Sequence, residues 1–135
     1  MKRALLAAAL LLVQGAWAQT PTDCPAPAAV RQRHLLGLWH AEFDDHGPGA
    51  TLLLEPHPDA EGSVRGMVNR NGELAQVAGE VEDGAFSLEE SANGTNISGT
   101  WAGEMVDGSC GREIRGAWQA EGDDAHPRSF VLRKR

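Results

Sequence analysis

Ile114-Arg115-Gly116-Ala117-Trp118 shows the pattern that decides the fold: an apolar residue, any residue, glycine, any residue and a second apolar residue. The same pattern occurs in Leu35-Leu36-Gly37-Leu38-Trp39, Val64-Arg65-Gly66-Met67-Val68, Val77-Ala78-Gly79-Glu80-Val81 and Ile97-Ser98-Gly99-Thr100-Trp101. Because residues two apart in a β-strand share a face, each glycine would lie between two large apolar side chains. At least one of the two intervening residues is polar in four of the five copies, which is typical of strands buried on one side only. The pattern therefore predicts an all-β protein.

The five glycines need a structural reason, because glycine in a strand interior costs about 0.5 to 1 kcal/mol relative to alanine. A strand can bend sharply at glycine as a sheet closes on itself, or glycine can leave space for a large aromatic side chain. Three tryptophans each follow such a glycine by two residues. We therefore predict that the glycines form slots for indole rings. The predicted structural core comprises Gly37, Trp39, Gly66, Gly79, Gly99, Trp101, Gly116 and Trp118.

Alternation of apolar and polar residues between turn signals predicts eight strands. Their expected ranges are 35–43, 50–55, 63–70, 73–82, 85–90, 95–103, 110–120 and 128–134. Asn71-Gly72, between the third and fourth, is a strong hairpin signal. Short connections make successive strands antiparallel, and a closed up-and-down barrel would remove the exposed edges. A two-sheet β-sandwich is the alternative. With three Trp and three Phe in its interior, such a barrel would be filled by side chains.

Two short motifs resemble those of the calycins, the lipocalin and avidin group of small exported β-barrels. They are Gly37-x-Trp39 in the first strand and Arg133 at the end of the last. The resemblance implies that Trp39 packs at the closed end of the barrel, beneath a basic residue from the final strand. It provides no set of ligand-contacting residues for this chain.

Residues 1–18 have the features of a signal peptide. Lys2 and Arg3 precede an apolar run over residues 4–13, and Ala16-Trp17-Ala18 is a cleavage motif. The apolar run is too short to cross a bilayer as a helix. We therefore expect an exported protein, periplasmic or extracellular, with no transmembrane segment in the mature chain. Residues 19–33 would form an extended tail and a short helix, and residues 34–135 the barrel domain.

Export to an oxidising compartment bears on the two cysteines, Cys24 and Cys110. Two cysteines in such a compartment most simply pair with each other. We expect an intramolecular disulfide, and the alternative is a bridge between two copies of the chain.

The charge balance excludes one class of partner. The chain has 12 Lys and Arg against 19 Asp and Glu, a net charge of −7, and loss of residues 1–18 would make it more acidic. Nucleic-acid binding needs a basic surface, so we expect no nucleic-acid partner. We also expect a monomer that carries no cofactor.

We find no catalytic set. The adjacent carboxylates of Glu89 and Glu90 would point to opposite faces of a strand and could not act together. Two predicted loops at one rim carry acidic residues beside a histidine, which suits a divalent metal if the loops meet. Solvated loops are the favoured interpretation. The metal candidates are Asp44, Asp45, His46, Asp123, Asp124 and His126.

Leu36, Leu38 and Leu53 break the alternation, because they are apolar on the predicted outer face. A contiguous exposed apolar surface has to be covered or used. Either residues 26–30 fold back over these side chains, or the side chains contact another protein. The leading hypothesis is a non-catalytic exported β-barrel that binds a partner protein or a small apolar ligand in the cell envelope. The alternatives are an inhibitor of an exported protease or lysozyme, and a metal-binding module.

Overall fold

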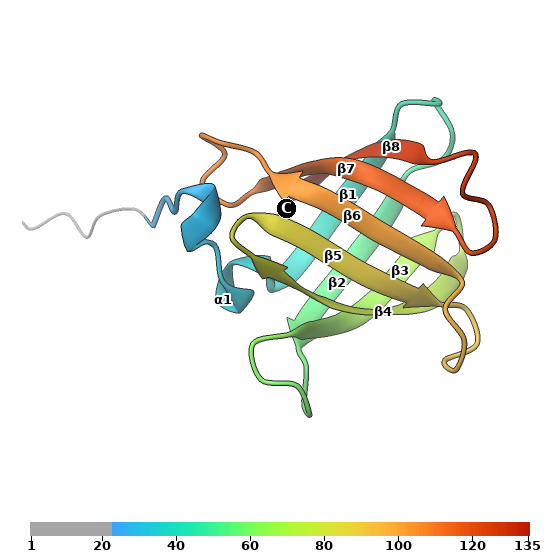
Figure 1. Ribbon diagram of the computed structural model, residues 1–135, viewed down its shortest axis with the longest axis horizontal. Coiled ribbons are helices and arrows are strands. Elements are labelled where there is room, and N and C mark those ends of the chain that lie inside the picture. Colours follow the sequence, from blue (N-terminus) through green and yellow to red (C-terminus); the bar gives the residue numbers. More distant parts are fainter. Residues whose placement is uncertain (1–22) are drawn as a thin grey trace, which may run out of the picture.

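A computed structural model describes residues 23–135, and the predicted signal peptide lies outside the described residues. Eight antiparallel strands form a closed barrel in sequence order, in which β1 pairs with both β2 and β8 (Figure 1). The prediction of an all-β closed barrel is therefore confirmed, and the sandwich alternative is wrong. The strands are β1 (Gly37–Phe43), β2 (Ala50–Pro56), β3 (Val64–Arg70), β4 (Glu73–Glu82), β5 (Ala85–Ser91), β6 (Gly99–Met105), β7 (Glu113–Ala120) and β8 (Arg128–Lys134).

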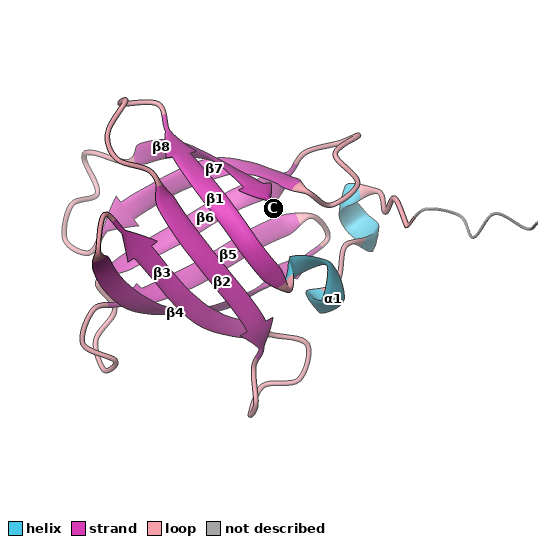
Figure 2. Ribbon diagram, turned by 180° about the vertical axis from the view of Figure 1, so that it is seen from behind, coloured by secondary structure: helices cyan, strands magenta, loops and turns pink. Residues whose placement is uncertain are grey.

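The tail lies at the barrel end where β1 begins, here called the tail end (Figure 2). It contains a 3-10 turn, η1 (Pro27–Ala29), and one short helix, α1 (Gln32–Leu35). Val30 and Leu35 are fully buried there. Cys24 is bonded to Cys110 in the turn between β6 and β7, which confirms the intramolecular disulfide.

The inward side chains fill the barrel. The largest fully buried ones include Trp39, Trp101 and Phe86, and the Trp101 ring lies 5.9 Å from that of Phe43 and 5.1 Å from that of Phe130. Such dense aromatic packing leaves an apolar guest little room without displacing side chains. Trp118 is only partly buried and lies towards the other end, here called the open end, where β1 ends and β8 begins.

The prediction that the glycines are slots for indoles is wrong at most positions. Only at Gly99 would a Cβ atom meet an indole, at 2.8 Å from Nε1 of Trp118. At Gly66, Gly79 and Gly116 an added Cβ would overlap a carbonyl oxygen of the neighbouring strand. These glycines therefore permit close approach of two backbones in a strongly bent sheet, the other use open to them. Gly37 has a φ of +114°, a conformation that strongly favours glycine.

Four strands, β1, β3, β6 and β7, begin later than the alternation predicts, and the difference is largest at β6 and β7. β6 begins at Gly99 rather than residue 95, because the side-chain oxygen of Asn93 accepts the backbone N–H groups of Thr95 and Asn96 and holds them in a loop. β7 begins at Glu113 rather than residue 110, because Cys110 has a φ of +58° within the turn. Local side-chain hydrogen bonds and turn geometry thus override the alternation at these points.

Candidate functional site

The open end of the barrel encloses a buried carboxylate. Glu90 is 2% exposed and accepts hydrogen bonds at Oε2 from the indole Nε1 of Trp101 at 2.7 Å and of Trp118 at 3.0 Å. Arg70 Nη2 donates to both of its oxygens, at 2.8 and 2.9 Å. The guanidinium carbon of Arg70 lies 4.6 Å from the centre of the Trp118 ring. These four residues, the Glu90 cluster, close the open end. Among the buried side-chain nitrogen and oxygen atoms of residues 23–135, only Nε of Arg70 has no hydrogen-bond partner.

Sequence reasoning missed the Glu90 cluster, although the alternation contains its signal. Glu90 continues the inward series of Phe86 and Leu88, and Arg70 continues that of Val64 and Val68. A charged residue at a buried strand position needs an opposite charge or several hydrogen bonds. The structure places Glu89 outside and Glu90 inside, as the strand geometry predicts.

A second arginine lies at the same end. Arg128 donates to both carboxylate oxygens of Asp45, and its guanidinium carbon is 4.0 Å from the centre of the Phe43 ring. The hydrogen bond from Arg128, and after it the one from the backbone N–H of Gly47, lowers the pKa of Asp45 to about 2. This pair fastens the loop after β1 to the first residue of β8.

We expect Asp45→Asn to remove part of the acid sensitivity of folding. Because the pKa falls on folding from 3.8 to about 2, the ionised carboxylate stabilises the folded state above about pH 4. That contribution disappears as the pH falls through about 2. The difference in urea midpoint between wild type and variant should therefore be clear at pH 5 and much smaller at pH 2. Asp44→Asn is the control, because it removes the same charge from the loop but keeps the Arg128 pair.

The metal candidates do not form one site. Asp45 is held by Arg128, and the Nδ1 atom of His126 is 2.8 Å from a carboxylate oxygen of Asp123 in its own loop. Within residues 23–135, no three or more His, Cys, Asp or Glu side chains are grouped so that they could hold a metal ion. The structure thus does not bring the acidic and histidine residues of 44–46 and 123–126 together.

At the tail end, a lysine occupies the place that the resemblance assigns to a basic residue. Lys134 Nζ lies 6.0 Å from the centre of the Trp39 ring and donates to the carbonyl of His34 at 2.7 Å. Burial, and after it the charge of Arg112, lowers the pKa of Lys134. Arg133 instead points outward, where its guanidinium contacts the carboxylate oxygens of nearby acidic residues. The assignment of this place to Arg133 is therefore wrong by one residue.

The outer face of β1, β2 and β3 carries a row of exposed apolar side chains, here called the apolar row. Leu38 pairs with Leu53 across β1 and β2, and Leu53 pairs with Met67 across β2 and β3. Their exposed fractions are 43%, 57% and 40%. Leu36 does not belong to this surface, because it packs against the core beside α1.

The tail leaves the apolar row open. The disulfide ties residue 24 to the turn after β6, and Pro27 lies against Gly84 in the turn after β4. Residues 26–30 therefore cover another part of the tail end, and the prediction that they shield Leu38 and Leu53 is wrong. Sequence reasoning found two members of the row but missed Met67, whose outward position follows from its register opposite Leu53.

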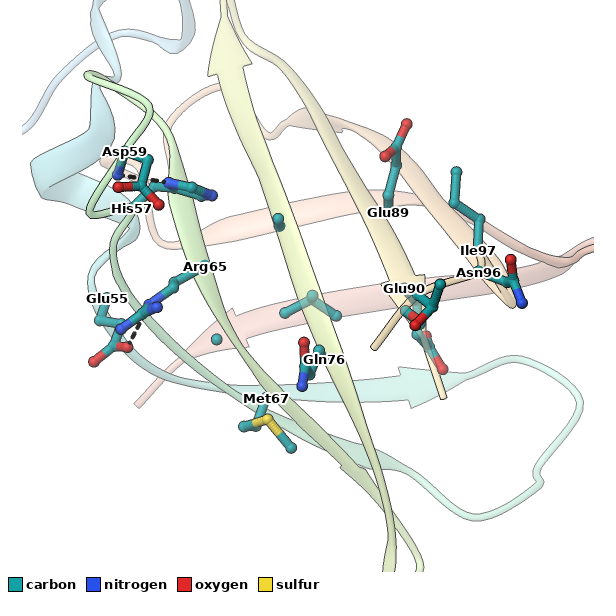
Figure 3. A pocket seen from close by; sticks show the side chains of 15 residues that line it. Glu55, His57, Asp59, Arg65, Met67, Gln76, Glu89, Glu90, Asn96 and Ile97 are labelled. Atoms are coloured by element: carbon teal, nitrogen blue, oxygen red, sulfur yellow. Dashed lines mark hydrogen bonds and ion pairs between the residues drawn. The ribbon is translucent and has the colours of Figure 1, made fainter. Parts of the chain in front are cut away.

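A groove of about 530 Å³ adjoins the row on the outer face of β3, β4 and β5 (Figure 3). Met67 belongs to both the row and the groove. His57 and Asp59 of the β2–β3 loop border one side, and Asn96 and Ile97 of the β5–β6 loop border the other. A hollow of this volume is in the range of known binding pockets.

Within residues 23–135, none of the helices combines the length and the apolar character needed to span a membrane. No protein-family model matches the chain. A search of curated proteins also found no match.

Proposed function

We propose that this protein is a non-catalytic exported binding protein, and that it contacts a partner protein through the apolar row and the adjoining groove. The exposed row carries the proposal. Leu38, Leu53 and Met67 are next to one another across three strands and form one continuous strip. Contiguous exposed apolar surface beside a concave site is characteristic of surfaces that bind other molecules.

The filled interior favours a protein partner over a small apolar ligand. Trp39 and Trp101 are fully buried in the barrel, and the Glu90 cluster closes the open end. An apolar guest would have to displace packed rings and separate a buried ion pair, and both are costly. Binding of a protein at the outer face would require neither of these rearrangements. The signal-peptide features of residues 1–18 are consistent with a partner in the cell envelope.

Leu53→Asp tests this function. Leu53 is 57% exposed, so the substitution should lower the free energy of unfolding by no more than about 1 to 2 kcal/mol, from lost cross-strand contacts and the low strand propensity of Asp. It places a charge in the centre of the row and should lower partner capture from an envelope extract at least tenfold. The readout is the amount of each protein retained by immobilised wild type and by the variant.

Leu74→Asp is the matched control, because Leu74 is equally exposed but lies outside the row and does not line the groove. Loss of one retained protein with Leu53→Asp only is the expected result. Equal retention by both variants of every protein that the wild type captures would show that the row is not the contact surface.

A further inference from the structure

The groove beside the apolar row combines two kinds of surface. Its floor includes Gly66 and Ala78, and the small outward side chain of Ala78 keeps the sheet surface low between the two bordering loops. Met67 and Ile97, 40% and 43% exposed, offer apolar contact within it. The floor and these side chains suit an apolar side chain of a partner.

The charged residues of the groove are mostly acidic. Glu55, Asp59 and Glu89 line it, and Arg65 is its sole Lys or Arg within the described part of the chain. Arg65 is paired with Glu55, with Nε 2.9 Å from the carboxylate. Among residues 23–135, the carboxylates of Asp59 and Glu89 have no hydrogen-bond or ion-pair partner. They therefore leave the groove with an uncompensated negative charge.

These two carboxylates border the groove from different elements. Asp59 belongs to the β2–β3 loop and Glu89 to β5, with β4 between β3 and β5 (Figure 3). His57 is turned towards its own loop, because its Nδ1 accepts the backbone N–H groups of Asp59 and Ala60. These two backbone groups occupy Nδ1 of the imidazole.

We propose that the groove binds a basic polypeptide segment of the partner protein, in which Lys or Arg side chains alternate with apolar ones. The cationic side chains lie at Asp59 and Glu89, and the apolar ones contact Met67 and Ile97. This inference rests on the proposed function and specifies the chemistry of the partner. Charge complementarity supports it, because opposite charges at an interface set partner choice and raise the association rate. An extended segment places alternate side chains on opposite faces. Its apolar side chains can therefore lie against the sheet while its cationic side chains are on the other face.

A peptide probe tests the chemistry without knowledge of the partner. Three labelled, acetylated hexapeptides with alternating Leu-Lys, Leu-Gln and Leu-Glu sequences are titrated with the mature protein, and fluorescence anisotropy gives Kd. The Leu-Lys peptide should bind at least tenfold more tightly than the Leu-Gln peptide, and the Leu-Glu peptide should bind most weakly. Raising the salt concentration should weaken the Leu-Lys complex, because the charges are close to solvent.

Matched variants distinguish peptide binding at the groove from attraction to the overall negative charge of the protein. Asp59→Asn with Glu89→Gln should raise the Kd of the Leu-Lys peptide at least tenfold. Glu104→Gln with Glu121→Gln removes the same charge from exposed positions that do not line the groove and should change Kd less than twofold. Equal losses in the two double variants, or equal binding of the Leu-Lys and Leu-Gln peptides, would overturn the inference.

The two proposals can fail separately. If Leu53→Asp abolishes capture of a partner but the groove variants leave capture and peptide affinity unchanged, the row is a contact surface and the groove is not the basic-segment site. If the groove variants weaken the peptide but Leu53→Asp leaves capture unchanged, the site binds basic segments and the proposed role of the row is wrong.

Discussion

Replacing Glu90 by alanine should lower the free energy of unfolding by about 3 to 5 kcal/mol, the usual cost of removing one member of a buried ion pair. The substitution leaves the charge of Arg70 inside the barrel mouth and the indole N–H groups of Trp101 and Trp118 without their acceptor. Buried donors that lose their only partner cost their full desolvation energy. Urea unfolding followed by tryptophan fluorescence provides the measurement.

Glu89→Ala is the matched control, since the same side chain is removed one residue away on the solvent side of β5. We expect its effect to be within about 0.5 kcal/mol. A double variant, Arg70→Leu with Glu90→Leu, should be more stable than Glu90→Ala, because apolar residues can replace a buried pair but not half of one. A loss below about 1 kcal/mol for Glu90→Ala would contradict the assignment of the Glu90 cluster as the closure of the open end.

Removal of the disulfide should have an effect of similar size. The bond joins residues 86 apart in sequence, and the chain-entropy relation for a loop of this length gives about 4 to 5 kcal/mol. Cys24→Ser with Cys110→Ser should therefore unfold at a much lower urea concentration than the wild type. Reduction of the wild-type protein by dithiothreitol should give the same shift.

The structure also indicates which part of the protein would be destabilised by removal of the disulfide. The bridge holds the segment before Val30 against the turn that contains Gly111, and Val30 is fully buried. The serine variant should thus show faster amide hydrogen exchange at α1 and η1 before global unfolding. A wild-type urea midpoint that reductant leaves unchanged would show that packing of the tail alone holds this end.

The sequence predicts the barrel because its decisive information is local. Period-two alternation and turns such as Asn71-Gly72 determine which residues face inward and how successive strands pair. The pairing of Cys24 with Cys110 was also predictable, because the expectation of export favours a disulfide and a chain with two cysteines has one simple intramolecular pairing. The starts of β6 and β7 were harder to predict from the sequence, because they depend on the side-chain hydrogen bonds of Asn93 and on the backbone turn at Cys110.

The glycine contacts and the surface features could not be predicted, because they depend on distances between strands and loops that the alternation of apolar and polar residues does not specify. Two strands can both have glycine on the inward side, yet only the three-dimensional arrangement places Gly66 and Gly116 against a carbonyl oxygen and Gly99 against an indole. Similarly, Leu53 was identifiable as an outward apolar residue, but its continuity with Met67 follows from strand register. The groove joins the β2–β3 loop to the β5–β6 loop across three strands, and no short-range pattern relates these segments.

The pairing of β1 with β8 has a consequence for the timing of folding. Trp39 lies opposite Lys134, and the backbone N–H of Arg135 donates to the carbonyl of Leu38. β1 therefore has both of its neighbouring strands only when β8 is present. A chain that emerges from a ribosome or a translocation channel cannot close its barrel until β8 has emerged. Contacts between such distant segments slow folding. The order of synthesis therefore delays closure of the barrel until the last strand is available.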